Sequence, residues 1–170
     1  MILYALSTAE LGVALFHSST VSFGDKAYMF LGVSGTGKST HSSLWLKYIE
    51  GTELLNDDNP VVRVFDDGHA TVYGSPWSGK TPYYRNLSYP LGGIVLLSQA
   101  PYNKIHRMSV VESFASLLPS CSVMKWDRRD YVGTCDTMAK LLELVPAYFL
   151  ENLPDEAAVR LSYQTMSGEK

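Results

Sequence analysis

The clearest chemical signal in the chain is the segment Gly32-Val33-Ser34-Gly35-Thr36-Gly37-Lys38-Ser39-Thr40. Its first eight residues match the phosphate-binding loop (P-loop, or Walker A) pattern of a glycine, four residues and then Gly-Lys-Ser/Thr. An apolar run at 27–31 precedes the loop and residues 39–49 can form a helix after it, so backbone N–H groups and a helix N-terminus would converge on one anion. We expect Lys38 to reach the β- and γ-phosphates of a nucleotide, and Ser39 to bind the magnesium ion between them. The alternative is a glycine-rich turn with a chance lysine.

A second signal is the acidic run Asn56-Asp57-Asp58-Asn59, which directly follows an apolar strand at 53–55. Asp57 comes 19 residues after Lys38, enough for one helix and one strand, so the pair is expected at the carboxyl end of a neighbouring strand, beside the phosphates. Two carboxylates this close can divide the work, one holding the metal and the other taking a proton from an acceptor hydroxyl. We predict that Asp57 helps hold the metal and that Asp58 is the base, with the reverse assignment open. A solvated turn that caps the strand is the alternative.

A third candidate is the loop that begins Gly74-Ser75-Pro76-Trp77-Ser78-Gly79-Lys80-Thr81 and runs to Arg85. It combines a cation, small hydroxyls and a large aromatic ring, which suits contact with a phosphate or a flat group. Trp77, Ser78, Lys80 and Arg85 are therefore the candidate acceptor-binding residues, and the loop is expected to act as a lid over the phosphates. Trp77 has an equally good interpretation as a packing anchor. For Arg85 the favoured interpretation is a surface arginine.

The rest of the chain predicts the elements that position these residues. Apolar alternation, turn residues and capping signals place strands at 13–16, 20–23, 27–31, 53–55, 61–65, 70–73, 92–97 and 147–150, and helices at 39–49, 109–118 and 136–145. Strand, helix and strand over 27–55 form a βαβ unit, so the sheet is expected to be at least partly parallel. The turn Asp66-Asp67-Gly68 joins 61–65 and 70–73 in a predicted hairpin. A capping box of Ser109 and Glu112 is predicted to begin the helix at 109–118, whose core-facing residues are Val110, Val111, Phe114, Leu117 and Leu118. Residues 74–90 are predicted to be a loop, and residues 166–170 a frayed tail.

Composition limits the fold and the partners. The chain has 170 residues, of which 46% are apolar and 18% charged, and it contains no repeat or long linker; we predict a single α/β P-loop domain over 1–170 with a mixed, partly parallel sheet flanked by helices. Its net charge of -3 argues against nucleic acid as a partner. No apolar run approaches the length that spans a bilayer, and the apolar N-terminal segment 1–16 is interpreted as core. Two cysteines, Cys121 and Cys135, without a metal-binding pattern favour reduced thiols and a cytoplasmic protein. The sequence leaves open whether the chain forms a homo-oligomer.

Together the loop at 32–40 and Asn56-Asp57-Asp58 resemble the catalytic domain of HPr kinase/phosphorylase and, more distantly, ATP-dependent phosphoenolpyruvate carboxykinase. The resemblance covers roughly residues 11–100, and His17, on the strand ahead of the loop, adds to it because HPr kinases carry a histidine in the same relation to the first glycine. It implies an HPr kinase-like and carboxykinase-like fold, ATP and Mg²⁺ as cofactors, and metal-binding and proton-transfer roles for Asp57 and Asp58. From its β-prone surroundings alone, His17 is interpreted as a buried, hydrogen-bonded residue rather than a base.

The sequence also departs from that family. The HPr kinase signature with its glutamate and arginine after the acidic pair is not found, and Gly74–Thr81 looks instead like the loop of HPr-kinase-like proteins of uncertain substrate found beside peptide-modification and small-molecule gene clusters. We therefore predict a divergent kinase that transfers the γ-phosphoryl group of ATP to a hydroxyl acceptor, which is a protein, a peptide or a small molecule. The competing hypothesis is a catalytically weak module in which ATP orders the second loop for a partner.

Overall fold

A computed structural model describes residues 1–79, 83 and 85–168. The strands of this part are β1 (Val13–Leu15), β2 (Ser18–Phe23), β3 (Lys26–Leu31), β4 (Glu53–Asp58), β5 (Val61–Val64), β6 (Ala70–Tyr73), β7 (Ser88–Gln99), β8 (Lys104–Arg107) and β9 (Ala147–Asn152). The helices are α1 (Ile2–Thr8), α2 (Lys38–Tyr48), α3 (Val110–Leu117), α4 (Arg128–Leu144) and α5 (Glu156–Ser167), with short 3₁₀ turns η1 (Ala9–Leu11) and η2 (Leu118–Ser120).

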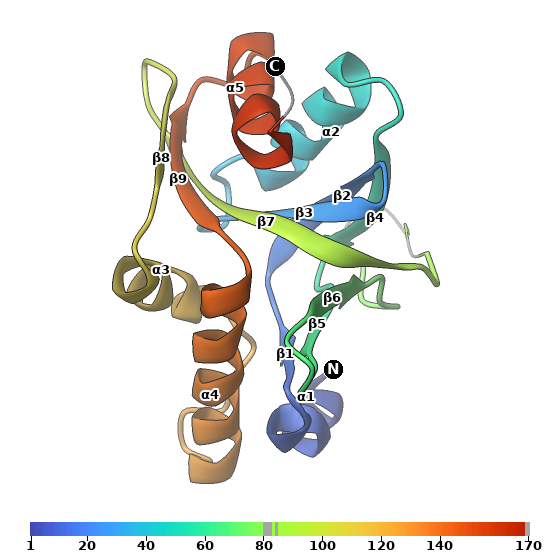
Figure 1. The fold of residues 1–170 in the computed structure, drawn as a ribbon, viewed down its shortest axis with the longest axis vertical. Helices are drawn as coiled ribbons and strands as arrows, with labels where there is room; N and C mark the ends of the chain where they lie inside the picture. The colour runs from blue at the N-terminus through green and yellow to red at the C-terminus, as the bar shows by residue number, and fades with distance from the viewer. Residues whose placement is uncertain (80–82, 84, 169–170) are drawn as a thin grey trace.

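The strands form a mixed sheet in the order β1-β5-β6-β7-β3-β2-β4, and β9 joins β7 to β8. The long strand β7 connects two regions, because its first residues pair with β6 and the rest pair in parallel with β3 and β9. Figure 1 shows α2 and α5 above this strand, and α3, α4 and the β5–β6 hairpin below it. The predicted α/β fold with a mixed, partly parallel sheet flanked by helices is confirmed.

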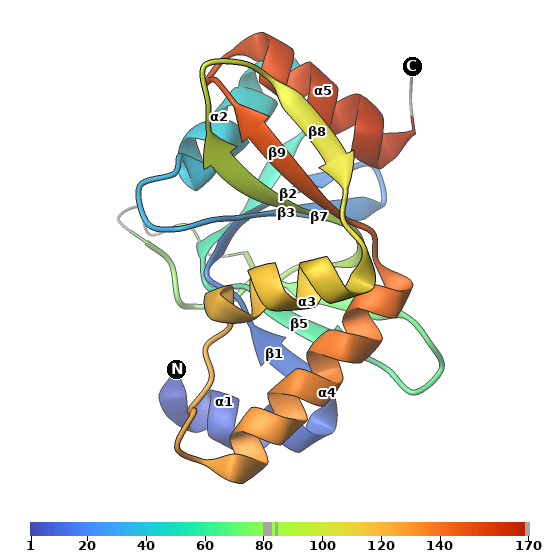
Figure 2. The same cartoon turned by 90° about the vertical axis from the view of Figure 1, so that its left-hand side faces the viewer.

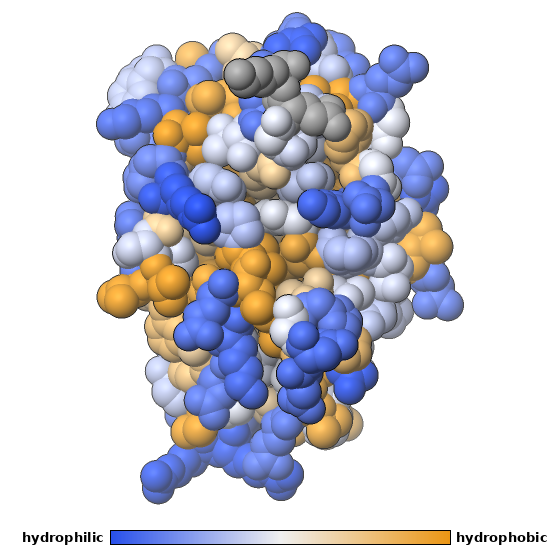
Figure 3. All heavy atoms as spheres, in the orientation of Figure 1, coloured by the Kyte–Doolittle hydropathy of each residue, from blue (hydrophilic) through white to orange (hydrophobic). Residues whose placement is uncertain are grey.

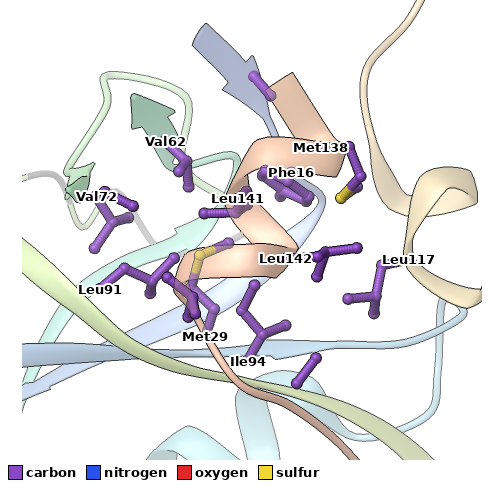
Figure 4. Packing of buried hydrophobic residues seen from close by; sticks show 14 of the residues in the cluster. Phe16, Met29, Val62, Val72, Leu91, Ile94, Leu117, Met138, Leu141 and Leu142 are labelled. Carbon is purple, nitrogen blue, oxygen red and sulfur yellow. The ribbon is translucent and has the colours of Figure 1, made fainter. Parts of the chain in front are cut away.

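Side chains of β3 alternate between two cores, as expected for a strand covered on both faces. Met29 and Leu31 belong to the core below the sheet, whereas Tyr28 and Phe30 belong to the core above it. Figure 4 shows the lower core, where the sheet and the hairpin meet the two lower helices, and labels Phe16, Met29, Val62, Val72, Leu91, Ile94, Leu117, Met138, Leu141 and Leu142. Because residues 27–31 of β3 are buried on both faces, the position of the strand end from which the P-loop begins is fixed by packing.

The upper core holds α2 and α5 against the sheet, one beside the other (Figure 2). Trp45 of α2 is fully buried there, and its indole N–H donates to Ser162 Oγ of α5 at 2.9 Å. The predicted helix at 39–49 is confirmed, one residue earlier at each end. Packing against the sheet and against α5 fixes the position of α2, and its N-terminus lies at the carboxyl end of β3.

The predicted neighbour relation inside the βαβ unit is wrong in one respect. Strands β3 and β4 point the same way, but β2 lies between them and pairs with both in antiparallel fashion. The helix therefore crosses over one intervening strand. The carboxyl ends of β3 and β4 still lie at one edge of the sheet, together with the start of β2.

Several of the predicted boundaries also change. Strand β4 runs to Asp58, so the acidic pair lies within the strand instead of following it. Helix α4 begins at Arg128, not near 136, because Asp127 caps it by accepting from Asp130 N; buried polar residues in its first turns hide the amphipathic pattern. Strand β7 extends the predicted strand 92–97 at both ends, so the loop at 74–90 is shorter than expected. The expected frayed tail at 166–170 starts too early, since α5, which was not predicted, runs to Ser167; residues 169 and 170 lie outside the described part.

Two predicted core assignments are wrong. The capping box of Ser109 and Glu112 is present, but Val111, which was placed on the buried face of α3, is 80% exposed. In the segment 1–16 the first four residues, at and just before the start of α1, are exposed, and burial is continuous only from Val13 to Phe16.

Figure 3 shows the surface of the face that is turned to the viewer in Figure 1. Hydrophilic residues cover most of it, and apolar residues gather near its centre. Within the described residues, none of the helices combines the length and the apolarity that crossing a membrane requires.

Candidate functional site

The P-loop joins the end of β3 to the start of α2. Gly35 and Gly37 have φ angles of 87° and 101°, which only glycine adopts without strain, and Gly37 is the residue that caps the helix. Thr36 closes the turn, since its backbone N–H and its hydroxyl both donate to Val33 O, at 3.1 and 2.7 Å. The loop thus leads directly into a helix N-terminus, where free N–H groups and the helix dipole favour an anion.

Lys38 is held inside this loop. Its ammonium group donates to Gly32 O at 2.9 Å and to Val33 O at 3.4 Å, and the residue is only 8% exposed. Burial lowers the pKa of Lys38, and the nearby carboxylates of Asp58 and Asp57 oppose that shift. A buried cation with two carboxylates as its charged neighbours fits the predicted role of a point charge facing phosphate oxygens.

Asp57 lies opposite the second residue of α2. The Ser39 hydroxyl donates to Asp57 Oδ1 at 2.9 Å, so the predicted metal pair is in contact. Hydroxyl and carboxylate oxygens are ligands that suit Mg²⁺, which takes its other ligands from waters and substrate phosphates. No cluster of three or more His, Cys, Asp or Glu side chains that could hold a metal occurs within residues 1–79, 83 and 85–168. The Ser39 hydroxyl and the Asp57 carboxylate could supply two of the ligands of such an ion.

Asp58 has a different partner from Asp57. Its Oδ1 lies 2.9 Å from Nδ1 of His17, and the two side chains are 31% and 46% exposed. The sheet explains this contact: Ser18 at the start of β2 pairs with Leu31 on one side and with Asp58 on the other. His17, just before β2, thus reaches the edge where the P-loop begins. The histidine side chain contacts a carboxylate, but it is half-exposed rather than buried as predicted.

These residues share one open cleft of about 550 Å³. It is lined by His17, Ser18, Ser34, Gly35, Gly37, Lys38, Ser39, Thr40, Asp57, Asp58 and Gly79. The structure thus brings together all the predicted catalytic and metal-binding residues and most of the P-loop. Of the predicted loop residues outside this lining, Val33 is exposed, whereas Gly32 and Thr36 accept and donate the hydrogen bonds that shape the loop.

Part of the second loop runs alongside the acidic pair. Gly79 N donates to Asp57 O at 2.7 Å, and Ser78 forms an isolated antiparallel bridge with Asp58. The buried Asn56 side chain ties this segment to β4 by donating to Ser75 O at 3.0 Å. Ser78 therefore lies beside the cleft, as predicted. The anchoring role of Asn56 was missed, although its position before the Asp pair was the available signal.

The other predicted acceptor residues are not brought to the cleft. Trp77 turns away and packs on Tyr4 of α1, with ring centroids 5.4 Å apart, which favours its interpretation as an anchor. Arg85 forms an ion pair with Glu53, at the opposite end of β4 from Asp57. Both side chains are at least partly exposed, and the hydrogen bond from Arg85 lowers the pKa of Glu53. Lys80 lies outside the described residues, as does part of the expected lid.

Comparison with known proteins adds a distant likeness. No protein-family model and no curated protein sequence matches the chain. Among solved structures, the Hpr(Ser) kinase/phosphatase from Coxiella burnetii is similar over 91% of this chain and 99% of its own, with 14% sequence identity and a TM-score of 0.47. At that identity and score the similarity is one of overall fold alone and says nothing about activity.

Proposed function

We propose that the chain is a phosphotransferase that uses ATP and Mg²⁺ to transfer the γ-phosphoryl group to a hydroxyl acceptor. The observation that carries this proposal is the division of partners in the cleft. Asp57 accepts a hydrogen bond from the P-loop hydroxyl of Ser39, whereas Asp58, one residue further along, lies 2.9 Å from Nδ1 of His17. In a phosphotransferase the first carboxylate would hold the metal and the second would act as the base, a role that binding of ATP alone does not require.

The phosphate-binding half of the site consists of the P-loop, Lys38, Ser39 and Asp57. Backbone N–H groups at the start of α2 and the Lys38 ammonium would neutralise charge on the β- and γ-phosphates. A magnesium ion bound here would supply positive charge that stabilises the transferring group. Ser39 and Asp57 would hold the metal, and Lys38 would exchange its carbonyl partners for phosphate oxygens.

The acceptor half of the site consists of Asp58 and His17. Asp58 would take the proton of the acceptor hydroxyl as the new O–P bond forms and the bond to the β-phosphate oxygen breaks, leaving ADP. His17 would orient that carboxylate through the 2.9 Å contact, as a positioning residue. Ser78 and Gly79, beside the Asp pair, supply backbone and hydroxyl groups at the place where an acceptor would enter. A protein serine, a peptide hydroxyl and a small-molecule hydroxyl all suit this chemistry.

A transfer experiment with two isosteric variants tests the proposal. The protein is incubated with γ-labelled ATP, Mg²⁺ and separate pools of serine peptides, proteins and hydroxylated metabolites, and labelled products are identified. Asp58→Asn removes the base, so we expect transfer to fall by about 100-fold or more with little change in Mg-ATP affinity. Asp57→Asn should weaken Mg²⁺-dependent ATP binding itself.

Asp66→Asn is the matched control, because Asp66 is exposed in the turn between β5 and β6. It should leave both binding and transfer unchanged. If all three variants bind Mg-ATP like the wild type and no acceptor is labelled, the Asp pair is a strand-end cap. The chain is then an ATP-gated binding module, not a kinase.

A further inference from the structure

A second hollow lies on the other side of the P-loop from Asp57 and Asp58. It has a volume of about 640 Å³ and lies between the start of α2 and the ends of β7 and β9. Gly35, Gly37 and Thr40 line both this hollow and the cleft of the acidic pair. A ligand with its phosphates in the loop can therefore extend past Thr40 into the hollow.

One wall of the hollow carries a buried histidine with an unused acceptor. His41 is 2% exposed, and burial lowers its pKa to about 4, so the ring is neutral at pH 7. Its Nε2 lies 3.0 Å from Ser162 Oγ, whose proton goes to Val159 O. With the Ser162 proton assigned to Val159 O in this way, Nε2 carries the ring hydrogen and donates it to Ser162. That leaves Nδ1 as an acceptor, and it is buried with no hydrogen-bond partner within the described part of the chain.

The opposite wall carries a second unused acceptor. Asn152, at the end of β9, is 9% exposed, and its amide nitrogen donates to Leu153 O at 2.8 Å. Its Oδ1 is buried and, among residues 1–79, 83 and 85–168, meets no donor. Buried polar atoms are rarely left unpaired, and each one costs stability unless a ligand or water supplies the missing bond. Two such acceptors beside one hollow indicate a ligand that brings hydrogen-bond donors.

The remaining lining defines the shape and charge of that ligand. Pro101, Leu153 and Pro154 supply apolar surface, and none of the described residues that line the hollow carries a formal charge. A flat, neutral ring system suits such a wall better than a sugar acid or a second phosphate does. Gln99 supports the adjoining loop by donating to Gly35 O at 3.2 Å, which fixes the passage between the hollow and the P-loop.

We infer that this hollow binds the nucleoside part of the nucleotide and selects a base with an exocyclic amino group. The inference rests on the proposed ATP-dependent function and adds to it the residues that would recognise the base. The amino group of adenine offers two N–H donors to acceptors of the type left on Asn152 and His41. Hypoxanthine has the same ring shape but carries a carbonyl oxygen in place of the amino group. That oxygen would face acceptors and leave them unpaired.

The experiment compares three probes by calorimetry in the presence of Mg²⁺: tripolyphosphate, ITP and ATP. Tripolyphosphate tests the P-loop alone, and ATP against ITP tests the amino group alone. We expect the wild type to bind all three, with ATP bound about tenfold or more tightly than ITP, as one well-made hydrogen bond to a buried acceptor allows. Asn152→Leu should reduce this ratio towards one and leave tripolyphosphate affinity unchanged.

The matched control is Glu151→Gln, the preceding residue of β9, whose carboxylate accepts from Tyr102 and does not line the hollow. It should keep the full preference for ATP over ITP. Equal affinity of the wild type for ATP and ITP would overturn the inference while tripolyphosphate binding upholds the P-loop. Failure of all three probes to bind would overturn the proposed function itself. If Asn152→Leu also abolished tripolyphosphate binding, Asn152 would support the structure of the P-loop and would not recognise the base, which contradicts the inference. The comparison of ATP with ITP on the wild type does not depend on whether any variant folds.

Discussion

The buried imidazole of His41 should make the stability of this protein depend on pH. Burial against the Phe30 ring and Trp45 lowers the His41 pKa from 6.5 to about 4. An unfolded chain takes up a proton on this residue near pH 6.5, whereas the folded chain does so only near pH 4. Stability from this group is therefore complete above pH 6.5 and is lost as the pH falls from there to about 4.

The size of the effect follows from the two pKa values. A shift of this extent corresponds to about 3 kcal/mol when the pH has fallen below both values. Between pH 7 and pH 5 the unfolded form gains most of its proton and the folded form very little, so about 2 kcal/mol is lost. For a domain of this length, that loss lowers the melting temperature by about 4–8 °C.

The perturbation is His41→Gln, which removes the titrating ring and keeps an amide that can donate to Ser162. Urea unfolding at pH 7, 6 and 5 measures the free energy of unfolding of the wild type, of this variant and of His106→Gln. His106 is the control, because its side chain is half-exposed, beside Glu112. The wild type and His106→Gln should lose about 2 kcal/mol more than His41→Gln between pH 7 and pH 5. Parallel pH profiles for the wild type and His41→Gln would refute the argument.

Three further predictions concern Lys38, Trp77 and Asp127. Saturation with Mg-ATP at 100 times its dissociation constant should stabilise the wild type by about 2.7 kcal/mol, and Lys38→Ala should remove that shift in differential scanning calorimetry while Lys47→Ala, on the exposed end of α2, keeps it. Trp77→Ala should lower the free energy of unfolding by about 2 kcal/mol through lost packing on Tyr4, yet leave the Mg-ATP shift intact. Asp127→Ala should cost about 1 kcal/mol in urea unfolding, because the first turn of α4 loses its cap.

Local patterns predicted the parts of the site that depend on neighbouring residues. The P-loop, the helix after it and the acidic run at the end of β4 are each encoded within a few positions, because glycine φ angles, helix capping and strand alternation are local properties. The capping box at Ser109 and the β5–β6 hairpin were found for the same reason. Helix α4 was placed too late because Asp130 and Thr134 are buried through hydrogen bonds and packing that only the folded chain provides.

Strand order could not be predicted in the same way, and it decides which residues reach the site. A βαβ unit allows β4 to lie directly beside β3 or one strand away, and both arrangements satisfy the same apolar pattern. The chain places β2 between them, with Ser18 opposite both Leu31 and Asp58. Because β2 runs antiparallel to its neighbours, its first residue, not its last, lies at the edge where the P-loop begins. His17 reaches Asp58 for that reason alone. If β4 lay directly beside β3, the acidic pair would still lie next to the P-loop. The strand β2, which follows His17, would then not lie between β3 and β4, and His17 would not be beside Asp58. The insertion of β2 is thus the feature of the fold that gives Asp58 a partner different from that of Asp57.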